Sequence, residues 1–183
     1  SSCWGGVFME NIVGADATLR DLSATDYHYP CDAVDDKYRE QCYMIQTSRM
    51  SEMGLDAEGI LAQCTMAGAW RDACIRSMGR DLSNTSVAGD PRAVSKICEE
   101  AFGADRVSCT TGVVFSLVDN TWDGKFGMPY CPTYLDPADQ LKCFSIVSGY
   151  LFHVYQKPGP AIAADCLKYV PGNAKCMVAA YQN

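Results

Sequence analysis

Apolar residues recur at helical spacing along most of the chain, and no stretch alternates as a β-strand would. Three stripes show this period most clearly: Cys74, Ile75, Met78 and Leu82; Val107, Thr111, Val114, Phe115 and Val118; Leu141, Phe144, Ser148, Leu151, Phe152 and Tyr155. Two helix starts are marked by Asp90-Pro91 and Asp136-Pro137. In each, Asp is a preferred N-cap, and Pro in the first turn costs nothing because its missing N–H would have no partner there. The pattern predicts an all-α chain.

The eleven cysteines divide this helical pattern at regular intervals. Apart from Cys3 they fall into five couples: Cys31/Cys42, Cys64/Cys74, Cys98/Cys109, Cys131/Cys143 and Cys166/Cys176. The two members of a couple are 10 to 12 residues apart, and successive couples begin 33 to 35 residues apart. A period of about 34 residues is typical of helix-turn-helix repeats.

The cysteines of one couple are too far apart to be joined along a single helix. Ten or eleven helical residues rise by about 15 to 17 Å, whereas a disulfide needs its two Cα atoms within about 7 Å. The chain must therefore reverse between them, and Gly68, Gly103 and Pro171-Gly172-Asn173 provide turn signals in three of the couples. We expect each disulfide to staple the end of one helix to the start of the next.

A longer repeat of about 102 residues lies over the short one. The four cysteines from Cys31 to Cys74 match those from Cys131 to Cys176 at offsets of 100 to 102, and both first cysteines follow an aromatic-proline segment, "DYHYPC" and "GMPYC", which we expect to be irregular. The predicted modules are 21–103 and 104–183. Residues 1–20 resemble the second half of a repeat, because "SSCWGGVFMENIVG" matches "CTTGVVFSLVDN".

Cys3 is thus expected to be unpaired within the chain or bonded to another subunit, with its missing partner segment upstream in the same precursor. A buried free thiol that packs as a small apolar side chain is the alternative.

In period and topology the chain resembles the TPR and Sel1-like helical-repeat proteins, some of whose secreted members staple each helix pair with a disulfide. The Trp-Leu-Gly-Tyr signature of TPR units is absent. The resemblance therefore implies stacked helical hairpins and assigns no functional residue.

Composition narrows the function classes. Cysteines at this density favour disulfides and an oxidising compartment, secreted or periplasmic, over metal clusters, because no CxxC motif occurs and only two histidines are present. The net charge of -7 argues against a nucleic-acid partner. No apolar run of about 18 residues exists, so we expect no membrane span.

Few residues fall in patterns that are typical of catalytic or metal-binding sites. His28 lies in an aromatic linker and His153 late on a long helix, and neither belongs to a recognised catalytic motif, so we expect no enzyme and no cofactor. Five methionines lie between residues 44 and 78 in the first half of the chain: Met44, Met50, Met53, Met66 and Met78. These methionines either pack in the core or provide thioether ligands for a copper site. "DNTWDG" resembles the start of a calcium-binding loop, although the twelfth position is Tyr130 rather than Glu.

The sequence thus favours a non-catalytic binding or assembly subunit with a protein partner, and a carrier of copper, haem or another small ligand is the alternative. Aromatic side chains dominate many interfaces. The candidate contact residues, which we expect to be exposed, are Tyr27, His28, Tyr29, Trp122, Tyr130 and Tyr134.

Overall fold

The computed structural model describes residues 2–16, 18 and 20–182, and these form ten α-helices and no strand. The helices are α1 (Ser2–Val13), α2 (Asp36–Glu52), α3 (Ala57–Met66), α4 (Arg71–Val87), α5 (Pro91–Glu100), α6 (Ala104–Asp119), α7 (Gly127–Tyr130), α8 (Pro137–His153), α9 (Gly159–Tyr169) and α10 (Ala174–Ala180). Two 3₁₀ turns, η2 (Gly68–Trp70) and η3 (Cys131–Thr133), complete them. The prediction of an all-α chain is confirmed.

Local sequence signals begin and end these helices. Asp90 caps α5 by accepting a hydrogen bond from the Ala93 backbone N–H at 3.0 Å, and Asp136 caps α8 in the same way. Between cysteines, Gly68 and Gly103 adopt φ values of 59° and 55°, which L side chains rarely adopt. These glycines let the chain turn back after α3 and α5.

Five disulfides join the ten cysteines in the couples that the spacing defines. Their Cα atoms are 5.4 to 5.7 Å apart, and all ten side chains are buried. Three of the bonds staple helical hairpins, α3 to α4, α5 to α6 and α9 to α10. The other two bonds tie a short segment to a helix: residue 31 to α2, and η3 to α8.

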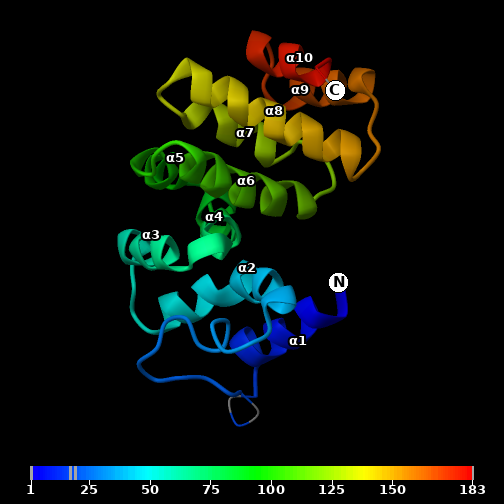
Figure 1. The fold of residues 1–183 in the computed structure, drawn as a ribbon. Coiled ribbons are helices and arrows are strands. Elements are labelled where there is room, and N and C mark those ends of the chain that lie inside the picture. Colours follow the sequence, from blue (N-terminus) through cyan, green and yellow to red (C-terminus); the bar gives the residue numbers. More distant parts are fainter. Residues whose placement is uncertain (1, 17, 19, 183) are drawn as a thin grey trace.

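The five helices that carry the second cysteine of each couple form one row, which α1 with the unpaired Cys3 extends at its start. We call α1, α2, α4, α6, α8 and α10 the B helices, and each packs against the next in this order (Figure 1). The closest crossing joins α4 to α6. A Cβ on Gly79 would lie 2.2 Å from the Cys109 carbonyl oxygen, and one on Gly112 would lie 2.0 Å from that of Arg76. Only glycine allows the two backbones to approach so closely.

Helix α1 occupies the first place in this row. Phe8 and Ile12 are buried, and Trp4 packs its ring on Tyr38 of α2 with centroids 4.1 Å apart. Cys3 is exposed and has no disulfide partner among the described residues. Positions 1, 17 and 19 of the predicted half-repeat 1–20 lie outside the described residues.

The two aromatic-proline segments differ from each other. Residues 27–31 of the first form bends and turns, whereas the second folds into the short α7 and η3. The prediction that "GMPYC" is irregular is therefore wrong. The expected exposure of Tyr130 and Tyr134 is also wrong, because these side chains are 0% and 1% exposed. The Tyr134 hydroxyl lies 2.6 Å from Thr110 Oγ1 and 2.8 Å from the Tyr130 hydroxyl, so both rings are buried with their polar atoms paired.

The proposed boundary at 103/104 lies inside a stapled hairpin. The Cys98–Cys109 bond spans it, and α4 of the first predicted module packs against α6 of the second.

Candidate functional site

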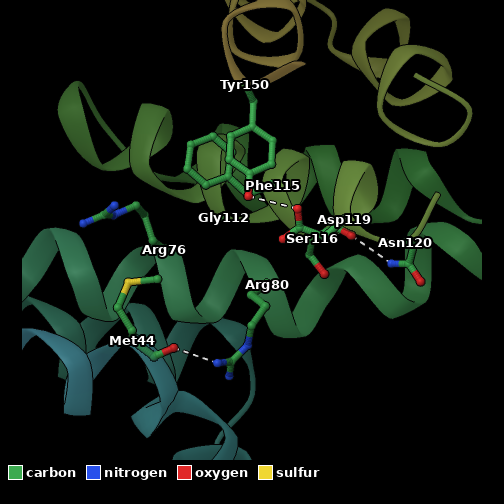
Figure 2. A pocket seen from close by; sticks show the side chains of 9 residues that line it. All are labelled: Met44, Arg76, Arg80, Gly112, Phe115, Ser116, Asp119, Asn120 and Tyr150. Carbon is green, nitrogen blue, oxygen red and sulfur yellow. Dashed lines mark hydrogen bonds between the residues drawn. The ribbon is translucent and has the colours of Figure 1, made fainter. Parts of the chain in front are cut away.

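A groove of about 500 Å³ lies across four B helices, α2, α4, α6 and α8. Figure 2 shows the side chains that line it, with the stacked aromatic rings on one side and the arginines of α4 on the other. The lining residues are Met44, Arg76, Arg80, Gly112, Phe115, Ser116, Asp119, Asn120 and Tyr150.

The aromatic wall consists of Phe115 from α6 and Tyr150 from α8. Their rings are stacked with centroids 3.9 Å apart and planes inclined by 13°. The Tyr150 hydroxyl donates to Asp119 Oδ1 at 2.9 Å, and the Tyr155 hydroxyl donates to the same oxygen at 2.7 Å. Burial and this carboxylate raise the pKa of Tyr150. The hydrogen bond to Asp119 and burial raise the pKa of Tyr155 to about 12. Both tyrosines are therefore protonated at neutral pH and hold the Asp119 carboxylate in place.

Arg80 forms part of the opposite wall and is held in place by several partners. Its Nη1 donates to the Met44 carbonyl oxygen at 2.7 Å, and its Nη2 donates to Ser48 Oγ at 2.9 Å and to Asp81 Oδ1 at 2.6 Å. The bonds to Met44 and Ser48 tie α4 to α2, as Figure 2 shows for the bond to Met44. Arg80 is a structural part of the groove wall.

Arg76 is held less firmly. Its Nη2 lies 2.8 Å from Asp72 and 3.5 Å from Glu40, and both carboxylates are more than half exposed. Its Nε is buried without a hydrogen-bond partner among the described residues. Exposed ion pairs of this kind contribute little to stability.

The floor of the groove is backbone, because α4 and α6 meet at glycine. No side chain rises at Gly112, and the neighbouring Ser116 hydroxyl is paired with Ser83 Oγ at 2.8 Å. The close helix crossing described above thus also keeps the groove open between its two walls.

A second cavity of about 370 Å³ adjoins the groove on the far side of the aromatic wall, between α6 and α8. Phe115 and Tyr150 line both cavities, and the second also contains Ile146, His153 and the exposed Val154. The stacked rings therefore form a ridge between a charged groove and a more apolar one.

The groove escaped the sequence analysis, although the repeat contains a signal for it. Met44 and Arg76 lie two residues after the second cysteine of their couples, as do Thr111 and Ser145 of the adjoining cavity. Arg80 and Phe115 lie six residues after theirs, and Tyr150 seven. The second and sixth positions are four residues apart and therefore share a helix face. Aligning the repeats on the second cysteine would have placed these side chains on one surface.

The predicted contact residues lie apart from the groove lining. Tyr27, His28 and Tyr29 are partly buried in the segment before α2. The His28 Nδ1 lies 3.1 Å from the Tyr43 hydroxyl, and the Tyr29 hydroxyl donates to Asp21 Oδ2 at 2.7 Å. Trp122 is 70% exposed, in a loop where its φ is 59°.

The residues considered for metal binding do not converge. Met50 and Met78 are buried in the core, and Met66 is exposed on α3. In the loop that resembles a calcium site, Asp119 and Asp123 both accept tyrosine hydroxyls instead. In the part of the chain that the structure describes, no group of three or more His, Cys, Asp or Glu side chains is placed to hold a metal ion. The copper or haem alternative stays a prediction.

Among the described helices, none has both the length and the apolar character needed to cross a bilayer. Comparisons found no protein-family model, curated protein or solved structure that matches the chain. The stacked rings, guanidinium groups and carboxylate of the groove are groups suited to binding.

Proposed function

We propose that this protein is a non-catalytic binding or assembly subunit that acts outside the cytoplasm and whose groove receives a protein partner. The observation that carries the proposal is the origin of the groove. Its walls are contributed by B helices of four successive cysteine couples, from α2 to α8, at matching positions after the second cysteine. A surface built this way extends along the row of helices, as the binding surfaces of helical-repeat proteins do.

The stacked B helices support the interpretation of the chain as a solenoid of stapled hairpins. Each B helix contacts its neighbours in the row, and each disulfide ties a B helix to the segment before it. Stability then arises from local hairpins and nearest-neighbour contacts. Such a scaffold keeps its surface rigid without a large central core, which suits a receptor for a partner.

Five disulfides support a secreted or periplasmic location, because such bonds persist in oxidising compartments. The groove also supports a binding role over catalysis. Its carboxylate, Asp119, already accepts two tyrosine hydroxyls, and the lining residues include neither histidine nor cysteine.

A selection from phage-displayed random dodecapeptides tests this proposal. Enriched peptides are expected to bind the wild-type protein and the Tyr155→Ala variant alike, and to lose at least tenfold in affinity for Tyr150→Ala. The two variants are matched, because both tyrosines donate to Asp119 and only Tyr150 lines the groove. Circular dichroism checks that each variant is folded. Peptides that bind all three proteins equally, or no enrichment at all, would contradict a receptor role for this groove.

A further inference from the structure

We infer that the groove receives an extended, basic segment of the partner, with a Lys or Arg head at Asp119 and an apolar side chain in the cavity beyond the aromatic ridge. This inference rests on the proposed function and gives the chemical class of the occupant.

The charge around the groove is the first argument. Asp119 lines it, and the arginines of the other wall are paired with Asp72, Glu40 and Asp81. Of these four carboxylates only Asp119 lines the groove, and with the two guanidinium groups they give this neighbourhood a net charge of -2, in a protein that carries -7. An acidic segment would meet a net negative surface, whereas a basic segment complements it and is steered toward it.

The position of Asp119 is the second argument. The residue is exposed, and both tyrosine hydroxyls bond to its Oδ1. A carboxylate has lone pairs left on its second oxygen. The hydroxyl donors fix the carboxylate at the hydroxyl edge of the Tyr150 ring and leave Oδ2 as the acceptor for a cation. A partly exposed ion pair of this kind corresponds to a gain in affinity of up to about fivefold.

The adjoining cavity is the third argument. It opens on the other side of the Phe115 and Tyr150 rings, and Ile146 and Val154 contribute apolar side chains to it. An extended chain advances about 3.3 Å per residue. Crossing two stacked rings takes about 7 Å or more, so the basic and apolar side chains of the segment stand two to four residues apart.

Fluorescence polarisation with synthetic peptides tests the inference. Three fluorescein-labelled probes are used, alanine-based decapeptides in which one Lys precedes one Leu by two, three or four positions. At least one is expected to bind, and replacement of its Lys by norleucine is expected to weaken binding about two- to fivefold. Replacement of the Lys by Glu is expected to abolish binding. Raising NaCl from 50 to 500 mM is expected to weaken the Lys peptide and to leave the norleucine peptide nearly unchanged.

Asp119→Asn provides the matching change in the protein. The amide keeps an acceptor for the two hydroxyls and loses the charge, so the variant is expected to fold and to bind the Lys and norleucine peptides equally. Asp123→Asn is the control, because Asp123 accepts the Tyr169 hydroxyl at 2.6 Å and does not line the groove. The inference is overturned if the Glu peptide binds as well as the Lys peptide, if Asp119→Asn changes nothing, or if no probe binds at 1 mM.

These outcomes separate the inference from the proposed function. Phage-selected peptides that need Tyr150 but carry no Lys or Arg would leave the receptor role standing and refute the basic occupant. Self-association that Tyr150→Ala abolishes, measured by sedimentation, would identify a second copy of this chain as the occupant and refute it as well.

Discussion

The segments before Cys31 and Cys131 hold equivalent places in the two copies of the cysteine pattern, yet they fold differently. Residues 27–31 form bends and turns, and the Gln46 side chain donates from Nε2 to the carbonyl oxygens of Tyr27 and Tyr29 at 2.8 and 2.9 Å. The corresponding position after Cys143 is Val147. Gln46 and Val147 are both completely buried.

The buried residue on the following helix matches the backbone conformation of each segment. A non-helical segment leaves carbonyl groups that need donors, and the Gln46 amide supplies two. The helical segment 127–133 pairs its own backbone groups, so an apolar side chain suffices beneath it. Gly127 packs there, and a Cβ on it would lie 3.3 Å from Val147 Cγ2. The two copies thus differ in whether a buried amide or an apolar side chain lies beneath the segment.

The largest test of this comparison removes the disulfide beneath each segment. The loops of Cys31–Cys42 and Cys131–Cys143 span 11 and 12 residues, so their loss through double alanine substitution is expected to cost about 3 kcal/mol each in the chain-entropy model. Urea unfolding measures both values. A difference of more than about 1 kcal/mol between the pairs would show that the surroundings, and not loop length, set the contribution.

Gln46→Leu addresses the amide directly. The change leaves two carbonyl oxygens without their donor, and we expect a loss of about 2 kcal/mol in the free energy of unfolding. Amide exchange should accelerate at Asp32 and Ala33, whose N–H groups bond to the His28 and Pro30 carbonyl oxygens inside this segment.

The reciprocal substitution, Val147→Gln, serves as the control. It buries an amide where the helical backbone offers no free carbonyl, so we expect destabilisation and unchanged exchange at Asp32 and Ala33. Unchanged exchange in Gln46→Leu would refute the role given to the amide.

Tyr134→Phe tests the hydroxyl chain of the second segment. Burial raises the pKa of Tyr134 to about 12, although its hydrogen bonds with Thr110 and Tyr130 act in the opposite direction. Without this hydroxyl, Thr110 and Tyr130 each lose one hydrogen-bond partner. We expect the free energy of unfolding, measured by thermal unfolding, to fall by about 1 kcal/mol. Tyr29→Phe is the matched change in the first segment, where the hydroxyl bonds to the exposed Asp21, and it should alter stability much less. Equal effects would contradict the contrast between the two segments.

The difference between the segments also marks how far the sequence predicts this molecule. The cysteine couples followed from covalent geometry, because ten to twelve residues of helix cannot bring two sulfur atoms together. The helix starts at Asp90 and Asp136 followed from local capping. Both depend on residues close together in the chain, which a single sequence displays.

Burial of Tyr130 and Tyr134 could not be derived in this way. It depends on Thr110, which lies 24 residues before Tyr134 and donates or accepts through a hydroxyl that pattern analysis treats as polar. The groove is an intermediate case, because the sequence contained part of the information needed to predict it. Its side chains come from separate repeats, and the regular spacing after each second cysteine was present in the sequence before the structure showed which face those positions share.

The smallest expected effect concerns the ion pairs that hold the first segment, for which Glu52 is the centre. Its carboxylate lies 2.7 Å from Arg20 and 2.8 Å from Arg49, and Arg49 also donates to the Ser23 carbonyl oxygen. Hydrogen bonds from the two guanidinium groups lower the pKa of Glu52 from 4.5 to about 2. Since the folded state has the lower pKa, this contribution is present above pH 4.5 and is lost as the pH falls toward 2.

We therefore expect Glu52→Gln to reduce stability at pH 7 by a few tenths of a kcal/mol, the range for exposed pairs, because the carboxylate is 45% exposed. The difference from the wild-type protein should shrink between pH 4.5 and pH 2, as measured by urea unfolding at each pH. Glu10→Gln, at an exposed position of α1, controls for the loss of one negative charge. A gap that stayed constant down to pH 2 would mean that Arg20 and Arg49 hold the first segment without needing the carboxylate, and that backbone acceptors such as Ser23 suffice.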